Sequence, residues 1–161
     1  MTNKLKIIGF GILIVVAAVC GASQTPSAQE KASSRADREK LMGAWHLASM
    51  TGPDGRQITS GVPLGMLIYT RDGHMSVQLM YPASENTLSN EYVQNGYEAS
   101  FGTYDVNGAT HTLTHHVQGA NTGDRIVGKD LPRVYQFNAK GQLIIRSARP
   151  DEHWSVTWQH Y

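Results

Sequence analysis

The sequence is almost free of cysteine. Its single cysteine, Cys20, lies within the first 22 residues. This segment has two lysines, an apolar run over residues 7–19 and small residues up to Ala22, which is the pattern of a secretory signal peptide. The run is too short to span a membrane comfortably. We expect cleavage after Ala22, so the exported chain has neither a disulfide nor a cysteine nucleophile. The alternative is a lipoprotein signal with the lipid attached to Cys20.

Several motifs of catalysis and binding are also missing. The sequence has no glycine-rich phosphate loop, no Gly-x-Ser-x-Gly elbow and no His-Glu-x-x-His motif. On one strand, His111 and His115 lie roughly 13 Å apart at ~3.3 Å per residue, and His116 points to the opposite face. The formal net charge is only +1, whereas proteins that bind nucleic acid carry a basic patch. We therefore expect no metal, no cofactor and no nucleic-acid partner.

What the sequence does contain is a strong hairpin signal over residues 65–80. Two apolar runs flank Thr-Arg-Asp-Gly, a typical tight turn. If Thr70 faces His74, one face of the hairpin is wholly apolar, while the other mixes apolar residues with Ser76 and Gln78. The pattern does not say which face looks inward.

The rest of the chain is organised as further short strands. We expect residues 23–40 to form a flexible tether, with a short helix over 35–40 capped by Ser34, and one more helix over 90–99, after the third strand. We expect the domain to cover residues 41–161, with strands over 41–50, 65–69, 74–80, 101–106, 110–118, 131–137, 142–147 and 154–161. Short turns join most of these strands and no βαβ spacing is present. The pattern predicts an all-β protein, an eight-stranded up-and-down antiparallel barrel with space for one small ligand.

The order of motifs resembles the bacterial lipocalin-like domain family. The residues that carry the resemblance are Gly43-Ala44-Trp45, Tyr69 to Met80, Phe101 to Val106, Thr114 to Gly119 and Arg133. It implies an eight-stranded calyx around a small, mostly apolar ligand, and it implies no single reaction. This chain departs from the family at its end, where many members have Trp-x-Arg and this one has Trp158-Gln159-His160. The arginine that usually covers the first-strand tryptophan is thereby missing.

Five residues are candidates for ligand binding. On their expected strands, His115 and Arg133 share faces with apolar residues, which favours positions inside the barrel. The resemblance implies polar residues at Ser76 and Gln78, which favours the cavity over the solvent face for both. Tyr104 adds a phenol to the same cavity. We expect the five side chains to orient a ligand by hydrogen bonds and charge, and no catalytic residue is identified.

Together these features favour an exported protein that binds a small hydrophobic molecule. The alternative is a cofactor-independent isomerase, cyclase or hydratase that uses the same cavity, with His115 and Arg133 near the substrate. A third interpretation is an interaction module that uses the outer wall of the barrel.

Overall fold

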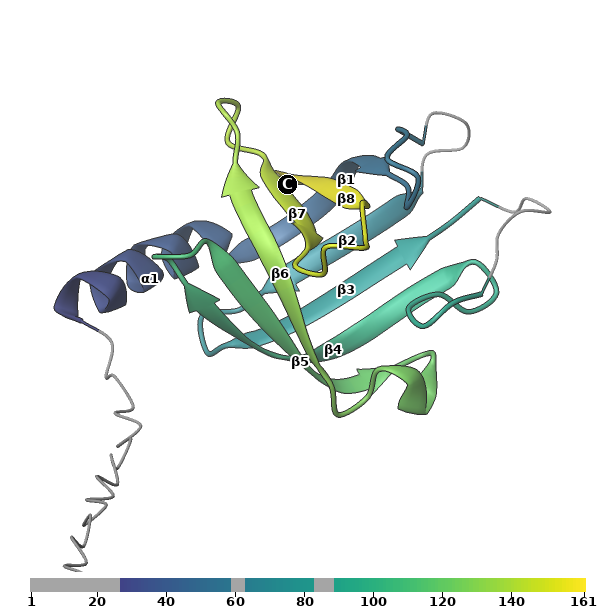
Figure 1. Cartoon of the computed structure of the whole chain (residues 1–161), viewed down its shortest axis with the longest axis horizontal. Helices are drawn as coiled ribbons and strands as arrows, with labels where there is room; N and C mark the ends of the chain where they lie inside the picture. The colour runs from purple at the N-terminus through teal and green to yellow at the C-terminus, as the bar shows by residue number, and fades with distance from the viewer. Residues whose placement is uncertain (1–26, 59–62, 83–88) are drawn as a thin grey trace, which may run out of the picture.

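Eight strands form a closed antiparallel barrel in the computed structural model, which describes residues 27–58, 63–82 and 89–161 (Figure 1). The strands are β1 (Gly43–Thr51), β2 (Leu64–Tyr69), β3 (His74–Met80), β4 (Tyr97–Asn107), β5 (Thr112–Ala120), β6 (Asp130–Phe137), β7 (Leu143–Ser147) and β8 (Ser155–His160). A 3-10 turn, η1 (Gly123–Arg125), lies between β5 and β6. Each strand pairs with the next, and β8 pairs with β1. The predicted up-and-down barrel is confirmed. The expected signal peptide lies outside the described residues.

The β2–β3 hairpin has the predicted register. Tyr69 is paired with Met75 and Leu67 with Val77, around a turn in which Gly73 has a φ of 91°, a conformation that favours glycine. These four apolar side chains are all buried. The wholly apolar face therefore points into the barrel, which the alternation alone does not determine.

The helix of this fold lies before the first strand. Helix α1 (Ala28–Leu41) begins at Ser27, which forms a capping box with Glu30. The expected flexible tether is thus helical from Ala28 onward, and the short helix expected over 35–40 is only the last part of α1. Ser33 and Ser34 pack against Gly108 in the β4–β5 turn, where a Cβ atom would lie 2.6 Å from the Ser33 backbone. This contact stabilises a helix that its polar composition does not indicate.

The helix predicted over residues 90–99, after the third strand, is wrong. The Asn90 side chain accepts hydrogen bonds from the backbone N–H groups of Tyr92 and Val93, at 2.8 and 2.9 Å. Asn95 and Gly96 then have positive φ values of 54° and 75°, which no α-helix accommodates. An asparagine side chain that bonds to the backbone after it favours a turn over a helix, and β4 follows directly.

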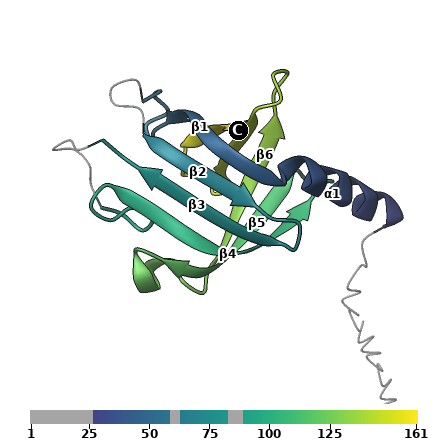
Figure 2. The same cartoon turned by 180° about the vertical axis from the view of Figure 1, so that it is seen from behind.

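Helix α1 covers one end of the barrel, beside the ends of β1 and β4 (Figure 2). The Arg38 guanidinium lies over the Tyr104 ring, 5.0 Å from its centroid, and donates to the Tyr104 carbonyl oxygen at 3.1 Å. The Tyr135 hydroxyl donates to the Asp37 carboxylate at 2.6 Å. These contacts attach the helix to β4 and β6, so this end of the barrel is closed.

Trp45 forms the centre of the closed end. Its side chain is buried, and its indole N–H donates to the Leu41 carbonyl oxygen at 2.9 Å. The His160 ring lies against it, with ring centroids 3.5 Å apart. In this chain a histidine therefore covers the tryptophan that the resemblance associates with an arginine.

Replacing Trp45 by alanine should lower the free energy of unfolding by about 3–5 kcal/mol, because it leaves a large cavity in the closed end. Trp45→Phe, which keeps a ring but loses the hydrogen bond to Leu41, should cost less. Denaturant unfolding of both variants measures the difference. A loss below about 1 kcal/mol for Trp45→Ala, typical of a surface change, would contradict the role assigned to this ring.

Candidate functional site

A cavity of about 820 Å³ occupies the other half of the barrel and opens at the end away from α1. Much of its wall consists of inward side chains of the strands, and residues that follow β3 and precede β4 and β8 lie at its mouth. Its apolar lining includes Met50, Ile58, Leu67, Val77, Leu79, Val93, Ile126, Leu131, Ile145, Trp154, Val156 and Trp158. The cavity has the size of a small-molecule site. Polar side chains interrupt this apolar lining, and the charged or titratable ones among them include His115, Arg133 and Glu98.

His115 lies in the cavity wall, as predicted. Its Nε2 atom is 2.7 Å from the Tyr69 hydroxyl, and the residue is only 6% exposed. Burial, together with the nearby Arg133 charge, lowers the pKa of the imidazole to about 3. His115 is thus a neutral hydrogen-bonding group at physiological pH and a poor general base.

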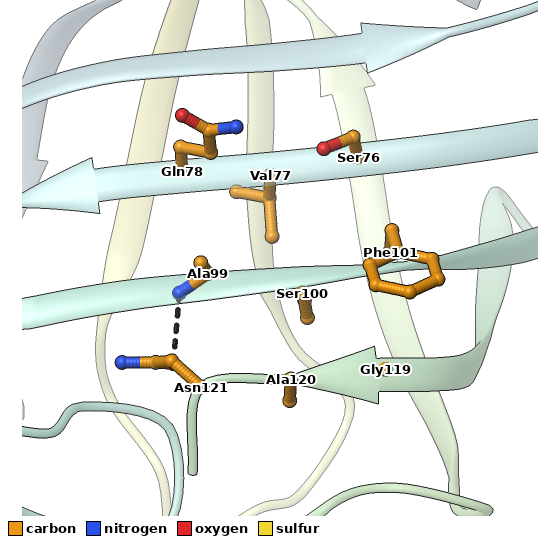
Figure 3. Close-up of a pocket in the computed structure, with 9 residues that line it drawn as sticks. All are labelled: Ser76, Val77, Gln78, Ala99, Ser100, Phe101, Gly119, Ala120 and Asn121. Atoms are coloured by element: carbon orange, nitrogen blue, oxygen red, sulfur yellow. Dashed lines mark hydrogen bonds between the residues drawn. The ribbon is translucent and has the colours of Figure 1, made fainter. Parts of the chain in front are cut away.

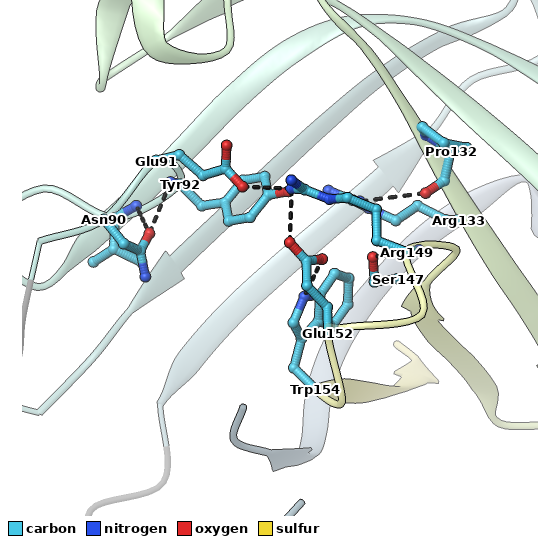
Figure 4. Close-up of polar contacts among 10 residues, drawn as sticks. Asn90, Glu91, Tyr92, Pro132, Arg133, Ser147, Arg149, Glu152 and Trp154 are labelled. Carbon is cyan, nitrogen blue, oxygen red and sulfur yellow. Dashed lines mark hydrogen bonds and ion pairs between the residues drawn. The ribbon is translucent and has the colours of Figure 1, made fainter. Parts of the chain in front are cut away.

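Arg133 also lies inside the barrel, as predicted, and is 6% exposed. Its guanidinium carbon lies 5.3 Å from the centroid of the Tyr92 ring and 5.0 Å from that of Trp154. One N–H group donates to the Pro132 carbonyl oxygen at 3.3 Å (Figure 4). Among the described residues, no carboxylate forms an ion pair with Arg133. The cavity therefore contains a buried cation that is held by aromatic rings.

A second arginine fixes these two rings at the mouth. Arg149 binds the Glu91 carboxylate and the Tyr92 hydroxyl, and lies 2.7 Å from Glu152. Glu152 in turn accepts a hydrogen bond from the indole N–H of Trp154 at 3.0 Å (Figure 4). Arg149 thus connects the segment before β4 to the segment before β8, and so positions both rings that contact Arg133.

Glu98 lines the same cavity and is not among the five residues predicted from the sequence. The Tyr81 hydroxyl lies 3.4 Å from its carboxylate, within hydrogen-bond distance. Burial raises the pKa of Glu98 to about 7, and the Arg133 charge opposes this rise. The sequence does contain a signal for Glu98, because on one continuous strand its side chain lies on the same face as those of Ser100 and Tyr104. The prediction of a helix over residues 90–99 concealed this signal.

The remaining three predicted residues lie elsewhere. Tyr104 is buried, but it belongs to the closed end. Its ring centroid is 4.6 Å from that of Tyr69, its hydroxyl donates to the Thr70 carbonyl oxygen, and it is not among the described residues that line the cavity. Ser76 and Gln78 lie on the outer face of β3, so their predicted inward orientation is wrong.

On the outer wall, Ser76 and Gln78 border a depression of about 310 Å³ on β3, β4 and β5 (Figure 3). Gln78 accepts a hydrogen bond from the Tyr97 hydroxyl at 3.2 Å. Phe101, which is 57% exposed, lies across Gly119. Side chains alternate along a strand, so Val77, which lies between the two polar residues, points inward, as does Leu79, which follows Gln78.

Comparison with known protein families matches residues 42–160 to a lipocalin-like domain. A search of curated proteins finds no match. In the part of the chain that the structure describes, no group of three His, Cys, Asp or Glu side chains is placed to hold a metal ion. None of the described helices is long and apolar enough to cross a membrane.

The shifted pKa of Glu98 predicts how the stability of the barrel depends on pH. The folded carboxyl, with a pKa of about 7, holds its proton more tightly than an ordinary one with a pKa of 4.5. Its presence should therefore destabilise the fold increasingly as the pH rises from 4.5 to 7. Glu98→Gln should match the wild type near pH 4.5 and exceed its stability by up to ~3 kcal/mol above pH 7, at about 1.4 kcal/mol per pKa unit.

Glu91→Gln provides the matched control for this measurement. Burial raises the pKa of Glu91, but hydrogen bonds from Arg149 and Tyr92 outweigh burial and hold the pKa below its usual value. Its contribution to stability is present above the ordinary pKa and is lost as the pH falls. Denaturant unfolding from pH 4 to 8.5 should show opposite signs for the two variants. Parallel curves would mean that Glu98 is not desolvated.

Proposed function

Since the chain belongs to the lipocalin-like domain family, we propose that it binds one small, mostly apolar molecule in the barrel cavity. The observation that carries the proposal is a cavity of about 820 Å³, open at one end and lined largely by aliphatic and aromatic side chains. Burial of apolar ligand surface in such a cavity contributes ~25 cal/mol per Å². His115, Arg133 and Glu98 give the ligand its orientation.

The same cavity also supports a second candidate function, proton transfer in an isomerase, cyclase or hydratase. The observation that favours it is Glu98, a partly buried carboxyl whose pKa of about 7 suits a general acid or base. Arg133, which lines the same cavity, would stabilise negative charge that develops on a substrate. In this interpretation Glu98 transfers the proton, and His115, which stays neutral, does not.

Two neighbouring isoleucines on β7 test the cavity as the binding site. Ile145 is 5% exposed and lines the cavity, whereas Ile144 points to the outer face. Ile145→Trp should fill part of the cavity and weaken binding of the neutral apolar dye N-phenyl-1-naphthylamine about tenfold or more, a loss of about 1.4 kcal/mol. Ile144→Trp should leave the affinity unchanged.

Fluorescence titration measures both affinities, and circular dichroism verifies that both variants fold. Equal effects of the two substitutions would place the dye outside the barrel and contradict the proposal.

An apolar compound incubated with the protein should be recovered unchanged by mass spectrometry. Its conversion by the wild type but not by Glu98→Gln would favour the enzyme instead.

We also propose that the protein is exported, on the signal-peptide pattern of its first 22 residues. The intact mass of protein recovered from its native compartment should correspond to a chain that begins at Ser23. A mass that includes diacylglycerol on Cys20 would show an anchored lipoprotein, and an unprocessed chain would contradict export.

A further inference from the structure

We propose that the cavity selects amphiphiles whose polar end is a single carboxylate, that Arg133 binds this carboxylate, and that Glu98 competes with it. The inference rests on the proposed binding of an apolar molecule and names the class of that molecule. It is carried by the position of Arg133, by the identity of its neighbours and by the charges that line the cavity.

Arg133 is a buried cation whose charge no described carboxylate neutralises in an ion pair. Burying a charge without a counterion is costly. The guanidinium carries five N–H donors, and among the described residues its hydrogen-bond acceptor is the Pro132 carbonyl oxygen. Donors therefore remain for a further acceptor, and a ligand in the cavity is the group in position to supply it.

The neighbours of Arg133 favour a planar anion. Tyr92 and Trp154 contact the guanidinium through their ring faces. These contacts leave the N–H groups at the edge of the guanidinium able to donate hydrogen bonds to a carboxylate. A carboxylate matches the fork of a guanidinium with two parallel hydrogen bonds. Because Arg149 holds both ring-bearing segments, Arg133 is positioned before a ligand arrives.

The charges of the cavity favour one negative charge over two. Of the described residues that line it, Arg133 is the only arginine or lysine, and Glu98 is the only acid. A phosphate monoester with two negative charges would find one cation and one nearby carboxyl. A monocarboxylate balances Arg133 with no charge left over.

Glu98 makes this pairing dependent on pH. The other titratable groups around Glu98 and Arg133 are Tyr81 after β3, Tyr69 on β2, Tyr92 before β4 and His115 on β5. Burial raises the pKa of each tyrosine and lowers that of His115, so all four stay neutral between pH 5 and 9. At the mouth, Glu91, Arg149 and Glu152 bind one another.

Glu98 is thus the group whose charge changes in this range. Below about pH 7 it is neutral and leaves Arg133 to the ligand. Above that pH its negative charge interacts with Arg133 and repels a second carboxylate. The affinity for a carboxylate should fall as the pH rises through about 7, and the affinity for a neutral ligand of the same length should not.

Dodecanoate and dodecanol, which share the same alkyl chain length, test the inference by displacement of N-phenyl-1-naphthylamine at pH 6 and pH 8.5. At pH 6 the wild type should bind dodecanoate at least tenfold more tightly than dodecanol. Arg133→Gln should abolish this preference and still bind dodecanol, and Arg133→Lys should restore part of it. Glu98→Gln should keep the preference at pH 8.5, where the wild type loses most of it.

Ile144→Trp, on the outer face, serves as the control and should behave as the wild type. Equal affinities of the two ligands for the wild type, or a preference that survives Arg133→Gln, would overturn the inference while leaving the proposed function intact. If neither ligand displaces the dye and the dye itself does not bind, the proposed function fails, and this inference fails with it.

Discussion

The pairing of β8 with β1 is the constraint on which the rest of the structure depends. Trp45 pairs with His160 and Met50 with Val156, and a bulge between Leu47 and Ser49 adjusts the register. This pairing leaves the sheet without an exposed edge and gives every strand one face toward an enclosed interior. Which side chains fill that interior then depends on which alternate positions of each strand point inward.

The two ends of the barrel use their interior differently. Large rings, among them Trp45, Tyr69, Tyr104 and Tyr135, fill the end beneath α1, and all four are about 1% exposed. Toward the other end, many inward positions are taken by aliphatic residues such as Val77, and the space between the side chains remains open. The helix therefore closes a packed floor, and the cavity lies above it.

The polar groups of the cavity differ in how the protein satisfies them. His115 is paired with the Tyr69 hydroxyl and Glu98 with that of Tyr81, and burial keeps both side chains neutral over part or all of the physiological range. Arg133 cannot become neutral in this way, because a guanidinium keeps its proton. Its charge is the feature of the cavity that most requires a partner, and the proposed selectivity for a carboxylate amphiphile rests on it.

Much of this protein is determined by its sequence alone. Alternation and turn residues predicted eight strands and the β2–β3 register, because these signals are local. They also placed His115 and Arg133 inside, since their strand neighbours on the same face are apolar.

Alternation does not distinguish the two faces of a strand such as β3, however, and only packing against β2 and β4 turned Val77 inward and Ser76 and Gln78 outward. The position of α1 and the presence of Glu98 in the cavity likewise depend on contacts between residues far apart in the chain, such as Tyr135 with Asp37 and Tyr81 with Glu98. Local propensity carries no information about such contacts, so the tertiary structure decided them.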